Sequence, residues 1–138
     1  MYFYDPVSCN QIDINYVDKK VYVTGMIVSI KKCFDIILIG IQDKSGTIQA
    51  SINPKIINNE LYVSASSLEE KKYITICGII EYRDLNNVNL KMKTGRLELI
   101  ADDFFLINPQ SEPQFDLFES SMIFTEEINS NSVINKYL

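Results

Sequence analysis

The chain has 138 residues, of which 46% are hydrophobic and 22% charged, and its net charge is −5. This length is enough for one domain with its own core, and the lack of an apolar run of about 18 residues argues against a transmembrane helix. There is no histidine, and the three cysteines show no Cys-x-x-Cys spacing. These features argue against a zinc site, a disulfide framework or any other metal site, and they predict a cytoplasmic protein. The first residues also lack the pattern of a signal peptide.

The charge is unevenly distributed along the chain. Residues 19–101 contain 12 Lys and Arg against eight Asp and Glu, whereas residues 102–138 contain seven acids and one lysine. The mildly basic part is compatible with nucleic acid binding, although ordinary surface charge explains it equally well. Charge and composition together divide the chain into three parts. We expect a lead-in that packs on the fold over residues 1–18, a domain over residues 19–108 and an acidic linker or extension over residues 109–138.

Five stretches rich in Val, Ile and Tyr predict β-strands. Three lie within residues 20–52, separated by Lys31-Lys32 and by a tight turn at residues 43–46, where Gly46 could adopt a positive φ. The first of them covers about residues 20–31, and two more strands follow over residues 72–83 and 96–108. Gly25 and Gly78 lie inside strands, where glycine often marks a bulge or a corner.

A helix is expected between the third and fourth strands, within residues 55–72. Apolar residues recur there at roughly the spacing of one helix face, and they are Ile56, Ile57, Leu61, Val63 and Leu68. Such a helix would close one end of a barrel. The combined pattern predicts an all-β fold, a five-stranded OB-fold barrel with a helix between strands 3 and 4 and an irregular C-terminal extension. OB-folds commonly bind oligonucleotides on the outer face of the barrel, but a fold alone does not determine a function.

The phase of the strands separates core residues from outward ones, because successive side chains point to opposite faces. The isoleucine-rich faces are the expected core. Leu38, Gln49 and Glu98 then point outward from three different strands. An outward Leu beside an outward Gln is a candidate platform for a planar ligand, and a solvated sheet surface is the alternative.

Two segments resemble a known family. GMIVSIKKCFDIILIGIQDKSGTIQ resembles the stretch of bacterial-type class II aspartyl-tRNA synthetases that reads GWV, a run of arginines, IFIDLRD and SGIVQV. NVNLKMKTGRLELIADDFFLINPQSEPQF is similar to the family's NxNxxxPTGEIEVxAxxxxxLNxSxxPPF. The resemblance covers about residues 15–127 and implies the N-terminal anticodon-binding domain of that family. The lysyl and asparaginyl synthetases share this barrel, and the INPQSEPQF stretch favours the aspartyl enzymes.

The resemblance implies roles for individual residues. In the family an aromatic residue stacks on an anticodon base, while a Gln and a Glu read base edges. Matched by motif, these positions are Leu38, Gln49 and Glu98, the same three residues that strand phase places outward. A Gln side chain can donate and accept hydrogen bonds, and an ionised Glu accepts them. Further contacts to the RNA are implied for Lys31, Arg83, Asn86, Asn87 and Lys91.

This chain departs from the family at several of these positions. Leu38 replaces the stacking aromatic residue, Glu81 replaces an arginine of the fourth strand, and Gln42 stands for the arginine of IFIDLRD. The family's run of arginines corresponds to Ser29, Ile30 and Lys31, so only one cation remains there. Each lost phosphate contact weakens RNA binding and makes it less dependent on salt.

The sequence contains none of the three class II catalytic motifs, so the chain by itself is expected to have no catalytic residues and no cofactor. ATP and Mg would be used only by the catalytic domain that follows this barrel in the family. If the chain is part of a longer protein, the resemblance implies an aspartate–tRNA ligase; a short protein that kept only the barrel is the alternative. The implied partner is tRNA, with tRNA-Asp as the first choice, and a homodimer is also implied.

Two other functions stay open from the sequence. One is a stand-alone OB-fold module that binds single-stranded nucleic acid without anticodon specificity. The other is a protein-interaction module that assembles through Leu38 and the C-terminal extension.

Overall fold

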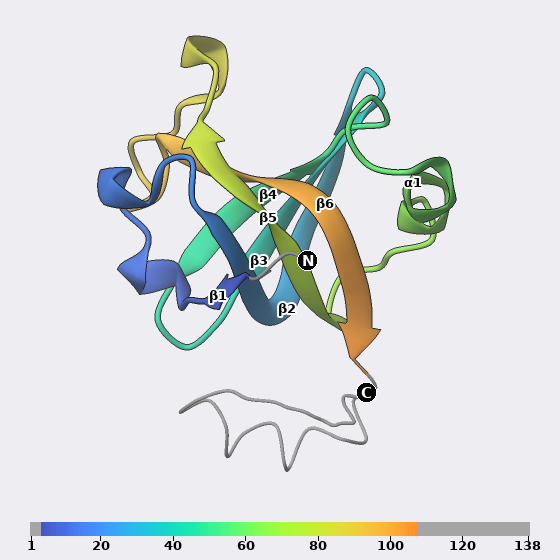
Figure 1. Cartoon of the computed structure of the whole chain (residues 1–138), viewed down its shortest axis with the longest axis horizontal. Coiled ribbons are helices and arrows are strands. Elements are labelled where there is room, and N and C mark those ends of the chain that lie inside the picture. Colours follow the sequence, from blue (N-terminus) through green and yellow to red (C-terminus); the bar gives the residue numbers. More distant parts are fainter. Residues whose placement is uncertain (1–3, 108–138) are drawn as a thin grey trace. The chain divides into compact units, whose positions relative to one another are not determined.

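The computed structural model describes residues 4–107, so the extension expected over residues 109–138 lies outside the described part (Figure 1). Six strands, three short 3-10 helices and one α-helix follow one another in this part. In chain order they are β1 (Asp5–Pro6), η1 (Cys9–Gln11), η2 (Ile14–Tyr16), β2 (Lys20–Cys33), β3 (Ile36–Gln42), β4 (Thr47–Ile52), α1 (Asn59–Ala65), β5 (Tyr73–Tyr82), η3 (Leu85–Asn87) and β6 (Leu97–Ile107). The five long strands and the helix between β4 and β5 are those that the sequence predicted.

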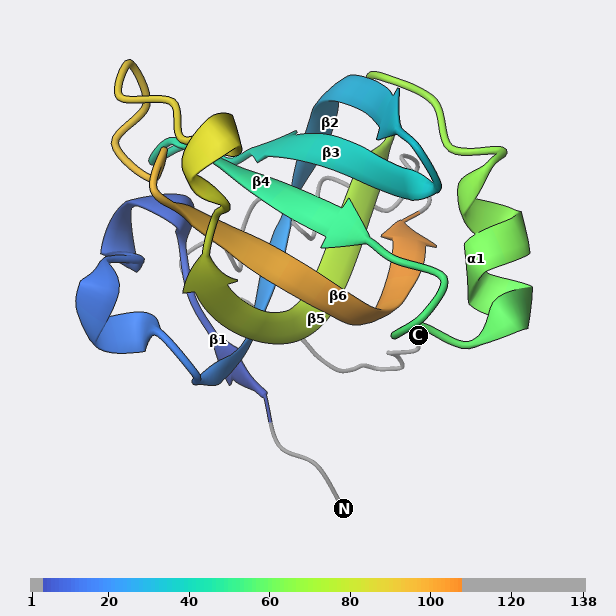
Figure 2. The same ribbon diagram turned by 90° about the horizontal axis from the view of Figure 1, so that it is seen from above.

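Strand β2 closes the sheet into a ring because it changes partner along its length. Its first half pairs antiparallel with β5 and its second half with β3, and Met26 is paired on both sides. The ring continues from β3 through β4 and β6 to β5, with β4 and β6 parallel (Figure 2). Gly25 lies at this corner, where a Cβ atom would come 2.4 Å from the carbonyl oxygen of Gln42. Any side chain here would clash with β3, so the corner requires glycine.

The second predicted corner is a bulge between β5 and β6. The register of the two strands shifts between Cys77 and Gly78. A Cβ atom at Gly78 would lie 1.9 Å from the carbonyl oxygen of Ile100, a distance that no side chain tolerates. The bulge increases the local twist and helps β5 to curve around the core.

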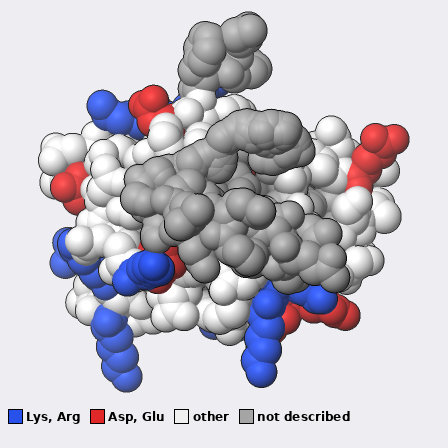
Figure 3. All heavy atoms as spheres, turned by 90° about the horizontal axis from the view of Figure 1, so that it is seen from below, with Lys and Arg blue, Asp and Glu red and all other residues white. Residues whose placement is uncertain are grey.

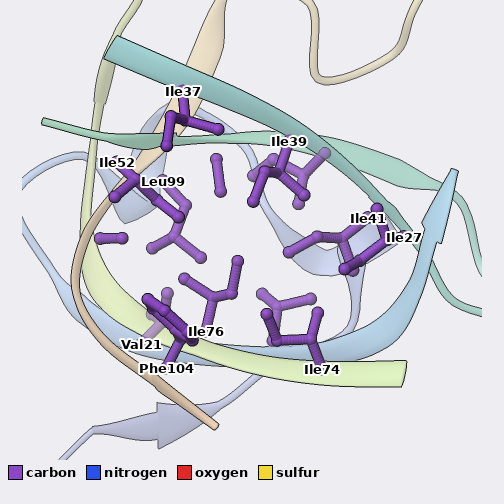
Figure 4. Packing of buried hydrophobic residues seen from close by; sticks show 14 of the residues in the cluster. Val21, Ile27, Ile37, Ile39, Ile41, Ile52, Ile74, Ile76, Leu99 and Phe104 are labelled. Atoms are coloured by element: carbon purple, nitrogen blue, oxygen red, sulfur yellow. The ribbon is translucent and has the colours of Figure 1, made fainter. Parts of the chain in front are cut away.

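The core lies inside the ring, and it includes the isoleucine-rich faces that strand phase assigned to it (Figure 4). Inward residues of all five long strands are fully or almost fully buried, and the largest are Val21, Val23, Ile27, Ile39, Ile41, Ile48, Ile52, Ile74, Ile76, Ile80 and Leu99. Burying one such aliphatic side chain contributes about 1.5–3 kcal/mol. The alternation inside and outside the ring is therefore fixed strongly by the sequence.

Helix α1 is shorter than the predicted segment. Asn58 begins it by accepting a 2.8 Å hydrogen bond from the backbone N–H of Leu61, and it ends at Ala65 before two serines. Ile57, Ala65 and Leu68 are buried against the barrel, as expected for a helix that covers its end. Val63, which the sequence assigned to the buried face, is 59% exposed, because with Ala65 facing the barrel its position points to the other side.

Two predicted turns differ in detail. Strand β2 continues through Lys31 and Lys32 to Cys33, so the turn to β3 consists of Phe34 and Asp35 and not of the two lysines. The turn after β3 exists as expected, but none of the glycines in the described residues has a positive φ. Its shape comes from Asp43 instead, whose Oδ1 accepts hydrogen bonds from Ser45 and from the N–H of Gly46.

The lead-in residues lie against the ring. β1 pairs in parallel with the start of β2, and Cys9 and Ile12 are buried in the core. The N–H of Cys9 donates to Oδ2 of Asp43 at 2.9 Å. This bond joins the lead-in to the turn between β3 and β4.

Candidate nucleic-acid interface

The outer face of the ring carries two rows of side chains that run across the strands. The register between neighbouring strands defines both rows. The Gln49 row consists of Ser29, Gly40, Gln49, Glu98 and Glu81. The Leu38 row consists of Lys31, Leu38, Ser51, Ile100 and Ile79. Figure 2 looks onto this face, with β3, β4 and β6 in front.

Gln49 and Glu98 form the centre of the Gln49 row. Gln49 Nε2 donates to Glu98 Oε1 at 3.4 Å, and both side chains are half-buried. Desolvation raises the pKa of Glu98, with Glu81 and Asp84 adding to the rise, while the hydrogen bond from Gln49 and the charge of Arg83 lower it. Gly40, next to Gln49 on β3, has no side chain to cover this pair. The pair therefore presents an amide and a carboxylate at fixed positions, as reading the edge of a base requires.

The Leu38 row is apolar apart from Lys31 at one end and the small Ser51 in the middle. Leu38, Ile100 and Ile79 are half-buried, and the small Ser51 is buried between Leu38 and Ile100. Lys31 lies directly opposite Leu38 and is exposed. This row offers a flat aliphatic surface with a cation at its edge, and it has no aromatic ring.

Arg83 occupies a different environment from the other predicted RNA contacts. It is only 6% exposed, and its Nε and Nη1 donate to the carbonyl oxygens of Leu97 and Asn87 at 2.9 and 3.0 Å. Its Nη2 lies 3.7 Å from the sulfur of Met92. Burial lowers the pKa of Arg83, and the nearby carboxylate of Glu98 opposes this shift. These contacts hold the guanidinium against the loop between β5 and β6, and the contact with RNA that the sequence predicts stays a prediction.

The loop over residues 83–96 carries the remaining predicted contacts. Asn86 and Asn87 belong to η3, and their side chains are exposed, as is that of Lys91. Thr94 is buried and donates from Oγ1 to the carbonyl oxygen of Thr47 at 2.7 Å, which ties the loop to the start of β4. Thr94 therefore fixes the loop to the barrel, while the side chains of Asn86, Asn87 and Lys91 are exposed to solvent.

The loop and the β2–β3 hairpin flank the two rows. In Figure 1 both project from the same side of the barrel, η3 at one end and the hairpin at the other. Lys31, Leu38, Gln49 and Glu98 thus lie together on one face, while Asn86, Asn87 and Lys91 lie on the loop beside it. On the opposite side of the protein, the visible Lys and Arg side chains are spread along the edge, several of them beside acids (Figure 3).

Sequence reasoning missed one prominent residue at this interface. Phe34, at the tip of the hairpin, is 94% exposed. The sequence signal that could have found it is an aromatic residue in a two-residue turn directly after two lysines. Its position became visible only when β2 proved to extend as far as Cys33.

Neither a metal site nor a membrane-spanning helix is found among the described residues. They include no cluster of three or more His, Cys, Asp or Glu side chains able to hold a metal ion. No helix in this part of the chain is both long and apolar enough to cross a membrane. None of the three cysteines forms a disulfide.

Relatives of known sequence match this chain over a fraction of their own length. No protein-family model matches. The aspartate–tRNA(Asp/Asn) ligase of Prochlorococcus marinus (strain MIT 9303) is 30% identical over 102 residues, which make up 74% of this chain and 17% of that ligase. The corresponding ligase of Legionella pneumophila (strain Corby) is 28% identical over 120 residues, 87% of this chain and 20% of the ligase. The chain thus spans about one fifth of the length of the curated relatives it matches.

Solved structures agree on the fold. The asparaginyl-tRNA synthetase from Pyrococcus horikoshii matches 74% of this chain and 23% of its own chain, with a TM-score of 0.63 and 20% sequence identity. This likeness confirms the predicted OB-fold.

Proposed function

This chain is a relative of one domain of the aspartyl-tRNA synthetases, and we propose that it holds the anticodon loop of a tRNA on the outer face of its barrel. The observation that carries this proposal is the half-buried pair of Gln49 and Glu98 beside the Leu38 row. Two polar side chains in contact with each other, next to the mainly aliphatic Leu38 row, are suited to the edge of one base while the aliphatic row covers its face.

The charges of the face support contacts with bases more than contacts with phosphates. Glu98 and Glu81 lie side by side in the Gln49 row, and two carboxylates would repel the RNA backbone. A carboxylate instead accepts hydrogen bonds from the amino and imino groups of a base such as guanine. Lys31 and Lys91 lie at the margins, where the backbone of a bound loop would pass.

The proposal also covers the tRNA that is bound, the cellular location and the enzyme to which such a domain belongs. The preferred partner is tRNA-Asp, and the protein acts in the cytoplasm, in agreement with three cysteines that form no disulfide. If the chain is part of a longer protein, that protein is an aspartate–tRNA ligase, and a homodimer is its expected state. ATP and Mg would then be used by a separate catalytic domain, while this chain contributes recognition of the tRNA.

A binding titration tests the proposal. The full chain is titrated with a tRNA-Asp anticodon stem-loop at two salt concentrations, and with a matched stem-loop whose middle anticodon base is changed. We expect binding that weakens with added salt and with the base change. Absence of binding to both stem-loops would contradict the proposal.

The alternative is an OB-fold module that binds single-stranded nucleic acid without reading its sequence. The missing aromatic side chain at Leu38 and the small number of cations favour this weaker activity. Equal affinity for both stem-loops, with the same dependence on salt, would identify it.

A further inference from the structure

The β2–β3 hairpin ends in a turn whose first residue has an unusual backbone. Cys33 and Ile36 are paired, so that only Phe34 and Asp35 connect the two strands. Phe34 has a φ of 57°, one of three positive values among the non-glycine residues of the described chain. The left-handed region is unfavourable for a bulky L-residue, and glycine, asparagine or aspartate is the usual choice there.

Packing does not account for a phenylalanine at this position. The side chain is 94% exposed, the highest exposure among the large hydrophobic residues of the described part. An exposed ring gains almost nothing from the hydrophobic effect, and the backbone would prefer a smaller residue. Neither packing of the ring nor backbone preference explains a phenylalanine here. An unfavourable backbone conformation that the fold does not explain is a reason to look for a function.

The hairpin tip is held in place from the side. The hydroxyl of Tyr62, on α1, donates to the carbonyl oxygen of Asp35 at 2.5 Å. The turn therefore has a fixed position relative to the barrel although its aromatic ring contacts solvent. Because the backbone of the tip is held, only the side chain of Phe34 has to be ordered when a flat ligand stacks on its ring.

The surroundings of Phe34 indicate which flat ligand this is. Lys31 and Lys32 are exposed in the last residues of β2, and Lys31 faces Leu38 across the ladder. Phe34 precedes Leu38 by four residues, which corresponds to at most about 13 Å of extended strand. An aromatic ring beside lysines, at a hairpin tip beyond a row that lacks a ring, is the combination by which proteins bind single-stranded nucleic acid.

We propose that Phe34 stacks on an unpaired base of the RNA whose neighbouring nucleotides reach the Leu38 and Gln49 rows. This inference rests on the proposed function and adds a contact to it. The hairpin tip supplies the aromatic surface, and the two lysines attract the backbone of the same nucleotides. The preferred ligand is thus an RNA loop with an unpaired base next to the ones read by Gln49 and Glu98.

The sequence contains no tryptophan, so Phe34→Trp introduces a single fluorescent probe at the tip. Titration of this variant with the anticodon stem-loop should quench the tryptophan emission in step with binding. Phe105→Trp is the matched control, because Phe105 is also an exposed aromatic residue but lies near the end of β6, opposite Thr75. Its emission should stay unchanged. Equal quenching of both variants, or of neither while RNA binds, would overturn the inference.

Phe34→Gly gives the second readout, since glycine accepts the positive φ without strain. We expect an apparent Kd for the stem-loop that is roughly ten-fold higher, within the range of one lost stacking contact, and a melting temperature that is not lower. An unchanged Kd would overturn this inference while leaving the proposed function in place. Failure of the unchanged protein to bind the stem-loop would overturn both.

Discussion

A tight turn adjoins each end of β3, and the two turns are formed in different ways. In the turn that follows β3, the side chain of Asp43 accepts hydrogen bonds from Ser45, Gly46 and Cys9, and joins the turn to the lead-in. In the turn that precedes β3, Phe34 has a positive φ and exposes its ring to solvent. The hydrogen bonds of Asp43 stabilise the fold. The turn at Phe34 has a less favourable backbone conformation and presents an exposed side chain.

This difference separates residues that the fold needs from residues that a ligand needs. If the distinction is correct, changes at Asp43 and Arg83 should lower stability. Changes at Phe34 and Glu98 should leave stability equal or raise it, and should lower the affinity for RNA.

The largest effect is expected for Asp43→Ala. The substitution removes the acceptor of four hydrogen bonds, two of them from the backbone of the turn and one from that of the lead-in. We expect the free energy of unfolding to fall by about 2–3 kcal/mol, since hydrogen bonds to charged groups contribute more than neutral ones. Urea denaturation measures this. Asp35→Ala, in the turn at the other end of β3, is the matched control and should change stability by less than about 0.5 kcal/mol.

Arg83→Met should have the next largest effect. It removes the side-chain donors to the carbonyl oxygens of Leu97, which is buried, and Asn87, which is exposed, and loss of the buried bond should lower stability by about 1–3 kcal/mol. If Arg83 anchors the loop, the salt dependence of RNA binding should stay the same. If it contacts a phosphate, the slope should decrease by about one. Arg96→Met, at an exposed arginine, controls for the loss of charge.

Phe34→Gly should have a small effect of the opposite sign. Relief of the left-handed strain should raise the free energy of unfolding by about 1–2 kcal/mol. The greater freedom of glycine in the unfolded chain should lower it by about 0.5–1 kcal/mol. The free energy of unfolding should therefore stay equal or rise. A clear loss of stability would mean that the ring packs against the fold, and the contrast between the two ends of β3 would disappear.

The smallest effect concerns Glu98 and depends on pH. Desolvation raises the pKa of Glu98 in the folded protein, so the folded state binds more protons than the unfolded state between the two pKa values. Stability should then fall as the pH rises through this window. Glu98→Gln should be more stable than the wild type at neutral pH, and the difference should vanish at acidic pH. Thermal unfolding across this range checks the sign, and a variant less stable at neutral pH would contradict it.

The ring could be predicted from the sequence because its signal is local. Alternation of Ile37, Ile39 and Ile41 with outward residues requires only the pleat of one strand, and all three are buried. The outward positions of Leu38, Gln49 and Glu98 followed from the same phase. The glycines at the corners were found because a close approach excludes every other residue.

The features that could not be predicted depend on partners far away in the sequence. Nothing in the sequence shows that Arg83 donates to the carbonyl oxygens of Leu97 and Asn87, and its contact with RNA stays a prediction. The shape of the turn after β3 depends on Asp43 and on the lead-in, and so glycine was given the wrong role. Phe34 was overlooked because Lys31 and Lys32 resemble the end of a strand. Exposed lysines can also belong to a strand, and here both are paired with β3.

The central claim is that Gln49 reads a base, and a cycle of four titrations tests it most directly. The unchanged 138-residue chain and its Gln49→Ala variant are each titrated with the tRNA-Asp anticodon stem-loop and with the stem-loop that carries a changed middle base. We predict that Gln49→Ala loses about 1–3 kcal/mol of binding free energy on the matching loop and almost nothing on the changed loop. Equal losses on both loops would contradict the account, because Gln49 would then contribute to binding without reading the base.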